Sequence, residues 1–218
     1  MLLSNKANIL NKYKTTIKTW DKIASLYQDK FMNLDLYNET YDVFCQQIKK
    51  KKSEILELGC GPGNITKYLI SKREDFKIKA TDVAPSMLKL AKENNPTVDF
   101  ELMDCREINT INQKFDGIMC GFTIPYLSKE DCSKLIKESC QLLNSDGILY
   151  LSMIKGDYSS SGYEFGSTGD KTYVYYYQEE YFINELAKNN FEVIELFKIK
   201  YPKTKDIAQT HLVFIAKK

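Results

Sequence analysis

A glycine-rich turn after a short apolar strand constrains the fold of this chain more than any other feature of its sequence. Residues 55–63 read Ile-Leu-Glu-Leu-Gly-Cys-Gly-Pro-Gly. Glycines at alternate positions let the backbone turn sharply and let a ligand approach the main chain. From Glu54 onward, short apolar runs alternate with helical segments. This alternation is typical of βαβ units and predicts an α/β fold with a mostly parallel sheet and helices on both faces.

The other strands and helices are expected at regular intervals after this turn, because apolar runs and helical periodicity alternate. We expect strands over residues 55–58, 77–81, 98–103, 115–121, 147–154, 191–199 and 210–216. We expect helices over residues 64–72, from Pro85 through Ala91, over 129–143 and over 179–188. Asn190 suits a left-handed cap at the end of the last helix.

The region before residue 54 has a different pattern, which predicts helices alone. Its apolar residues recur at three- and four-residue steps and form one stripe, made of Ile17, Trp20, Ala24, Tyr27 and Phe31. We therefore expect a helical N-terminal cap over residues 1–52 that contributes to the active site. Residues 53–218 are expected to form the core.

Residues 155–177 combine flexibility with many aromatic side chains. Residues 155–171 are rich in glycine and serine and are expected to form a loop or flap, and residues 172–177 are β-prone. The aromatic residues are Tyr158, Tyr163, Phe165, Tyr173, Tyr175, Tyr176 and Tyr177. Two interpretations remain open: a lid that closes over an apolar or cationic acceptor, and an ordinary strand that packs its tyrosines.

Composition and charge exclude several classes of protein. The 218 residues are 43% hydrophobic and 28% charged, as in globular domains. No apolar stretch is long enough to span a bilayer, and the first residues lack the apolar region of a signal peptide, so a cytoplasmic location is expected. The net charge of +2 is not that of a nucleic-acid binder. The run Lys49 to Lys52 is either a patch for anions or a solvated helix end.

The cysteines and the histidine indicate neither a metal site nor disulfides. The six cysteines form no C-x-x-C pair, and His211 is the one histidine that could join them. No metal is therefore expected, and small reduced core residues are the preferred interpretation of the cysteines. A core or edge role is expected for His211, which falls on a late strand.

Acidic residues follow the second and third expected strands. Asp82 can accept hydrogen bonds from both hydroxyls of a ribose, or can cap the next helix. Asp104 can accept from an exocyclic amine, and the Cys105 amide can donate to a ring nitrogen. Val83 and Met87 offer apolar surface to a purine. Because ligands of open α/β sheets lie at the carboxyl ends of the strands, these residues predict a nucleoside site there.

Two common nucleotide motifs do not fit the turn. The fingerprint G-x-G-x-x-G would need its third glycine where Asn64 stands, and no G-K-[ST] ending of a P-loop follows. A nicotinamide dehydrogenase is therefore disfavoured.

Four motifs in order make the chain resemble the class I S-adenosylmethionine-dependent methyltransferases. The family motif E/D-x-G-x-G-x-G is similar to residues 57–63, and D-x-S-x-x-M-L is similar to residues 82–88, with Ala84 in place of serine. That replacement removes a helix cap worth roughly 1 kcal/mol. Residues 100–105 and 115–121 resemble the next two motifs, and Trp20-Asp21-x-x-Ala24-x-x-Tyr27 resembles the opening helix of small-molecule members.

The resemblance implies a Rossmann-like, seven-stranded sheet and S-adenosylmethionine as cofactor. It also implies which residues bind. The cofactor residues would be Glu57, Gly59, Cys60, Gly61, Gly63, Asp82, Val83, Met87, Asp104, Cys105 and Cys120. The acceptor residues would be Trp20, Tyr27, Phe122, Tyr126 and Tyr175. Cys60 and Cys120 are expected to be small neighbours of the cofactor and not nucleophiles.

The resemblance also implies in-line methyl transfer to a small molecule by a monomer or homodimer. No general base is identified, and the absence of Asn/Asp-Pro-Pro-Tyr/Phe after the fourth strand argues against amino-methylation of nucleic acid. The charge of −3 over residues 53–218, which hold 21 Lys/Arg and 24 Asp/Glu, also disfavours RNA. The alternatives are a methyltransferase acting on RNA or protein and a catalytically silent partner protein.

Overall fold

The computed structural model describes residues 2–204 and 206–218, with the side chains of residues 2–7 outside the description. Its centre is a seven-stranded sheet in the order β3-β2-β1-β4-β5-β9-β8. The first five of these strands are parallel, and β9 runs antiparallel to both β5 and β8. The strands are β1 (Glu54–Leu58), β2 (Lys77–Asp82), β3 (Asp99–Leu102), β4 (Phe115–Cys120), β5 (Leu143–Ile154), β8 (Glu192–Pro202) and β9 (Ala208–Lys217). The predicted fold class is confirmed.

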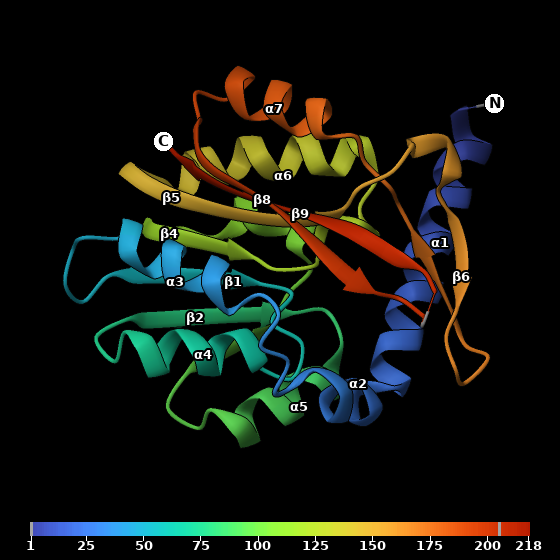
Figure 1. Cartoon of the computed structure of the whole chain (residues 1–218), viewed down its shortest axis with the longest axis horizontal. Coiled ribbons are helices and arrows are strands. Elements are labelled where there is room, and N and C mark those ends of the chain that lie inside the picture. Colours follow the sequence, from blue (N-terminus) through green and yellow to red (C-terminus); the bar gives the residue numbers. More distant parts are fainter. Residues whose placement is uncertain (1, 205) are drawn as a thin grey trace.

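Helices cover both faces of the sheet (Figure 1). One face packs against α3 (Asn38–Gln47), α4 (Asn64–Lys72) and α5 (Pro85–Asn94), and the other against α6 (Lys129–Leu142) and α7 (Glu179–Lys188). Neighbouring residues of β1 alternate between the two cores, since Ile55 packs with the first group and Leu56 with the second. Burial on both faces explains why the strands read as continuous apolar runs.

The N-terminal region is helical, as predicted. Helix α1 (Leu2–Lys22) runs past the carboxyl ends of the parallel strands, and α2 (Ala24–Phe31) lies beside α5 (Figure 1). No helix in the described part of the chain is long and apolar enough to cross a membrane. The 3₁₀ segments η1 (Cys105–Thr110), η2 (Ile124–Tyr126) and η3 (Tyr158–Ser160) complete the elements outside the hairpin described next.

The expectation of a loop over residues 155–171 is wrong in part. Strand β6 (Gly162–Phe165) pairs with β7 (Lys171–Val174) in an antiparallel hairpin. The rings of the cross-strand pair Tyr163 and Tyr173 lie 5.2 Å apart, edge to face. The four-residue strand β6 was missed because the segments on both sides of it are short and rich in glycine and serine. The pair of Tyr163 and Tyr173 stabilises the hairpin.

Most predicted boundaries agree with the structure to within a few residues. Helices α4 and α7 coincide with their expected ranges, and Asn190 adopts a φ of 60°, as its capping role requires. Strand β5 starts at Leu143, directly after α6, four residues before the expected start.

Candidate active site

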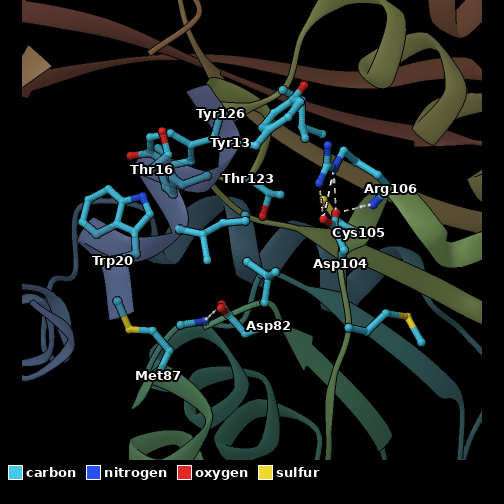
Figure 2. A pocket seen from close by; sticks show the side chains of 18 of the residues that line it. Tyr13, Thr16, Trp20, Asp82, Met87, Asp104, Cys105, Arg106, Thr123 and Tyr126 are labelled. Carbon is cyan, nitrogen blue, oxygen red and sulfur yellow. Dashed lines mark hydrogen bonds and ion pairs between the residues drawn. The ribbon is translucent and has the colours of Figure 1, made fainter. Parts of the chain in front are cut away.

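A pocket opens at the carboxyl edge of the sheet, between the ends of β1 to β4 and helix α1. It holds about 860 Å³ of empty space, part of which is open solvent. Figure 2 shows Asp82 and Met87 on one side, Trp20 on another, and Asp104 with Arg106 opposite. Its lining includes these predicted site residues: Gly59, Gly61, Asp82, Val83, Met87, Asp104, Cys105, Trp20, Tyr27, Phe122 and Tyr126.

The glycine turn exposes its backbone to this pocket. Gly59 and Gly61 have φ angles of 68° and 56°, which side chains rarely adopt. A Cβ on Gly59 would lie 2.2 Å from Thr123 Oγ1, whereas a Cβ on Gly61 would find its nearest neighbour, Tyr27 Cε1, at 3.7 Å. Gly59 is therefore required for packing, and Gly61 leaves room where the main chain borders the pocket.

Asp82 connects the glycine turn to the end of β2. Its Oδ2 accepts a hydrogen bond from the Gly61 backbone N–H at 2.8 Å, and its Oδ1 accepts from the Ala84 N–H at 2.9 Å. Burial raises the pKa of this carboxyl, and the backbone donors lower it again in part. Each oxygen can still accept from a ligand, since a carboxylate has about four acceptor positions. Both interpretations of Asp82, ligand contact and local backbone cap, are compatible with this arrangement.

Asp104 is bound by a residue that the sequence did not single out. Arg106 donates from Nε to Oδ1 at 2.9 Å and from Nη2 to Oδ2 at 2.5 Å, and its backbone N–H donates to Oδ1. Burial raises the pKa of Asp104, but the bonds from Arg106 outweigh burial and hold it below its ordinary value. The guanidinium also lies 4.0 Å from the centre of the Tyr13 ring. Arg106 thus uses most of the accepting capacity of Asp104.

Aromatic rings from three segments also line the pocket. The Trp20 ring lies 5.4 Å from the rings of both Tyr27 and Tyr126, edge to face in each case. Phe122 adds a fourth ring and has a φ of 57°, in the left-handed region. An aromatic residue at this φ is strained, and such strain concentrates at functional sites. Trp20, Tyr27, Phe122 and Tyr126 are called the aromatic wall below.

The remaining predicted site residues lie outside the lining. Glu57 is buried beneath the turn, where it accepts a hydrogen bond from Thr66 Oγ1 at 2.6 Å. Gly63 is the N-cap of α4, and a Cβ on it would meet Asn95. Cys60 and Cys120 are buried in the two cores, and Tyr175 is buried against Tyr158. Any contact between these five residues and a ligand stays a prediction.

Sequence reasoning missed eight lining residues: Tyr13, Thr16, Ile17, Met103, Arg106, Gly121, Thr123 and Leu127. Tyr13 could have been found, because it extends the stripe of Ile17 and Trp20 by one helical turn. Its hydroxyl donates to Asp131 and accepts from the Ser128 N–H at 2.9 Å, which fastens α1 to the start of α6. Arg106 carried no signal beyond its position two residues after Asp104.

His211 lies in the core, as expected, outside the pocket lining, and its ring is 5.4 Å from that of the lining residue Phe122. Its Nδ1 is 2.7 Å from the hydroxyl of Tyr37, and burial lowers its pKa to about 4. Among the described residues, no group of three or more His, Cys, Asp or Glu side chains could hold a metal ion.

The chain matches a family of known proteins over β1 to β4 and the beginning of β5. Residues 55–147 fit the family model described as a methyltransferase domain. This segment contains the glycine turn, Asp82 and Asp104, so the match covers the carboxylate side of the pocket. The aromatic wall lies partly outside it, because Trp20 and Tyr27 precede residue 55.

Two curated relatives and one solved structure are similar to the chain. It is 34% identical over 105 residues to the malonyl-[acyl-carrier protein] O-methyltransferase of Acetivibrio thermocellus, across 47% of this chain and 36% of that protein. It is 31% identical over 101 residues to the trans-aconitate 2-methyltransferase of Variovorax paradoxus, across 46% and 38%. The matches therefore span less than half the length of these relatives.

The solved structure is the 1,6-didemethyltoxoflavin-N1-methyltransferase of Burkholderia thailandensis, with 1,6-didemethyltoxoflavin and S-adenosylhomocysteine bound to it. It has a TM-score of 0.69 and 16% identity, and the match covers 99% of this chain and 89% of that one. At this identity the likeness shows a shared fold.

Proposed function

Because the chain belongs to the class I S-adenosylmethionine-dependent methyltransferase family, we propose that it binds S-adenosylmethionine and methylates a small molecule. The observation that carries the proposal is the convergence of the Gly61 backbone, Asp82 and Asp104 on one pocket. We also propose that residues 1–52 act as a helical cap over a core formed by residues 53–218, since α1 contributes Tyr13, Thr16, Ile17 and Trp20 to the same pocket.

The residues present fit this cofactor. The space beside Gly61, which a Cβ would fill, suits close approach of a ligand to the main chain. Asp82 would accept from the ribose hydroxyls, while Val83 and Met87 would pack on the purine. The Cys105 N–H and the remaining accepting capacity of Asp104 would face the purine edge. S-adenosylmethionine supplies a methyl group that is already activated by a positively charged sulfur.

The protein's own contribution would be alignment and exclusion of water. Holding two reactants in line supplies on the order of 7–11 kcal/mol of a barrier. The aromatic wall lines the same pocket as Asp82, where it would position an acceptor and keep water out. Burial raises the pKa values of Tyr27 and Tyr126 well above their ordinary range, so both hydroxyls stay protonated. Neither tyrosine would therefore act as a base at neutral pH.

A small acceptor is favoured over RNA by the charge of the pocket and by the activities that the names of similar proteins state. The described side chains that line the pocket include one cation, Arg106, and Asp104 neutralises it. The trans-aconitate enzyme and the didemethyltoxoflavin enzyme act on small molecules by name.

Binding calorimetry tests the cofactor half of the proposal. S-adenosylmethionine and S-adenosylhomocysteine should bind, and NAD should not. Asp82→Asn should weaken S-adenosylhomocysteine binding by about 1.5–3 kcal/mol, as expected when hydrogen bonds to a charged group are lost. Asp99→Asn, at an exposed position on β3, is the matched control and should bind like the wild type. Tight NAD binding without either sulfur nucleoside would refute the proposal.

Incubation with labelled S-adenosylmethionine and a metabolite extract tests the acceptor half. Label should enter a small molecule. Specific methylation of one tRNA position at physiological salt would instead identify an RNA methyltransferase.

A further inference from the structure

We infer that the methyl acceptor presents an uncharged nitrogen with a free lone pair, carried on a small aromatic molecule. This inference rests on the proposed methyltransferase function and narrows it to one class of substrate. It follows from three properties of the pocket: its charge, its lack of a base, and the aromatic wall.

The charged side chains of the pocket leave no cation for an anionic acceptor. Arg106 binds both oxygens of Asp104 through Nε and Nη2 and stacks on Tyr13, so its charge is already paired with a carboxylate. Asp82 accepts hydrogen bonds from the backbone N–H groups of Gly61 and Ala84, and no cationic side chain pairs with it among the described residues. A carboxylate entering beside Asp82 would therefore find no free cationic side chain among the described lining residues.

The cofactor would balance this charge. S-adenosylmethionine has a sulfonium, an ammonium and a carboxylate, which sum to +1, and an ionised Asp82 would contribute −1. The loaded pocket would thus be close to neutral, and an uncharged acceptor would keep it so. A carboxylate or phenolate would add a negative charge in a region shielded from water.

No side chain in the described lining is suited to remove a proton before methyl transfer. The lining holds neither histidine nor lysine, and Tyr27 and Tyr126 keep their protons. Asp82 is engaged by the N–H groups of Gly61 and Ala84, and Asp104 by Arg106. An alcohol or a phenol would need such a base. An amine or a ring nitrogen attacks through its lone pair and needs none.

The methyl-transfer step conserves charge for such an acceptor. The nitrogen lone pair forms the new N–CH₃ bond as the S–CH₃ bond breaks, and the electrons of the broken bond stay on sulfur. The positive charge therefore moves from sulfur to nitrogen, and a proton on that nitrogen then leaves to water. The aromatic wall would stabilise the cation that forms on nitrogen, because ring faces attract cations. Trp20, between Tyr27 and Tyr126, is the centre of this wall.

Binding of matched probes to the protein loaded with S-adenosylhomocysteine tests the inference. Aniline and benzoate have similar size and shape, and they differ in whether nitrogen or carboxylate is attached to the ring. At neutral pH, calorimetry should show aniline binding at least about tenfold more tightly than benzoate. Equal or tighter binding of benzoate would overturn the inference, and so would a failure of both probes to bind.

Two variants of Tyr126 test the contribution of the aromatic wall. Tyr126→Phe keeps the ring and should bind aniline like the wild type. Tyr126→Leu removes the ring and should weaken aniline binding about fivefold or more. If Tyr126→Leu binds aniline unchanged, the wall does not select the acceptor. S-adenosylhomocysteine binding is measured first in each protein. If the wild type does not bind S-adenosylhomocysteine, the proposed function itself is wrong. A benzoate preference with intact S-adenosylhomocysteine binding would refute the substrate class alone.

The chemical stability of labelled products gives an independent readout. Methyl esters release their label as volatile methanol in mild alkali, whereas N-methyl groups keep it. The label transferred to an extract should survive alkali, and release of volatile label would contradict the inference.

Discussion

Asp21 in α1 accepts a hydrogen bond from the backbone N–H of Ser86 in the first turn of α5, with 2.7 Å between Oδ1 and N. The N-cap of α5 is Ala84, which has no side chain to satisfy that turn. A carboxylate from another helix thus caps this turn. The same contact holds α1 over the pocket, beside Met87.

Asp21→Ala should lower the free energy of unfolding by about 1 kcal/mol, the usual cost of a lost N-cap. Urea denaturation measures this change. Asp29→Ala, at an exposed position in α2, is the matched control and should stay within about 0.5 kcal/mol of the wild type. Equal stability of the two variants would show that the Asp21 contact does not act as a cap.

Glu57 should make the protein less stable as pH rises. Burial raises its pKa from 4.5 to about 8, against the opposing hydrogen bond from Thr66. The folded state therefore holds a proton that the unfolded state loses above pH 4.5. The contribution of Glu57 to the free energy of unfolding thus falls between pH 4.5 and 8 and is constant above pH 8.

Glu57→Gln should remove this dependence, because an amide keeps the bond to Thr66 and does not ionise. The difference in unfolding free energy between variant and wild type should grow from pH 4.5 to 8 by on the order of 3–5 kcal/mol. Glu54→Gln, at the partly exposed start of the same strand, is the control. A difference that stays constant with pH would mean that Glu57 is ionised in the folded protein.

Breaking the Asp104–Arg106 pair should move acid unfolding to higher pH. Since the pKa of Asp104 is held below its ordinary value, the pair stabilises the fold above the unfolded-state pKa of about 3.9. That stability is lost as pH falls through the folded pKa. Arg106→Gln should therefore unfold at a higher pH on acid titration, followed by circular dichroism. Lys77→Gln, which removes the exposed ion pair with Glu54, should leave the acid midpoint unchanged.

The cofactor side of the site could be predicted from the sequence because its signals are local. The glycine turn, Asp82 and Asp104 each follow a strand directly, and strand ends meet at one edge of a parallel sheet. The family resemblance drawn from these residues is confirmed by the match over residues 55–147. Asn190 was predictable for the same reason, since a helix end needs a residue that tolerates a positive φ.

The contacts that close the pocket could not be predicted, because they join segments far apart in the chain. Nothing in the sequence indicates that Tyr13 contacts Arg106 and Asp131. Nor does it indicate that Thr16 Oγ1 accepts a hydrogen bond from the Tyr173 backbone N–H at 2.9 Å. Periodicity identifies the stripe on α1 that faces inward but not its partners. The ion pair between Arg106 and Asp104 likewise depends on the fold, because the fold buries much of both side chains.

Two alanine substitutions in the glycine turn should have different effects, although both place a side chain at a positive φ. Gly61→Ala should fold with a loss of about 1–2 kcal/mol from backbone strain, since its Cβ has room beside Tyr27. Its affinity for S-adenosylhomocysteine should fall, because the methyl group occupies the edge of the pocket. Gly59→Ala should lose more stability, since its Cβ would lie 2.2 Å from Thr123 Oγ1.

A double-mutant cycle separates the clash at Gly59 from the strain. Thr123→Ala removes the clashing hydroxyl, together with its hydrogen bond to the Leu58 carbonyl. Gly59→Ala combined with Thr123→Ala should therefore be more stable than the sum of the single losses predicts, by about 1 kcal/mol or more in urea denaturation. Gly61→Ala with Thr123→Ala is the matched control and should be additive. Additive losses at Gly59 would mean that backbone strain alone, and not contact with Thr123, requires glycine there.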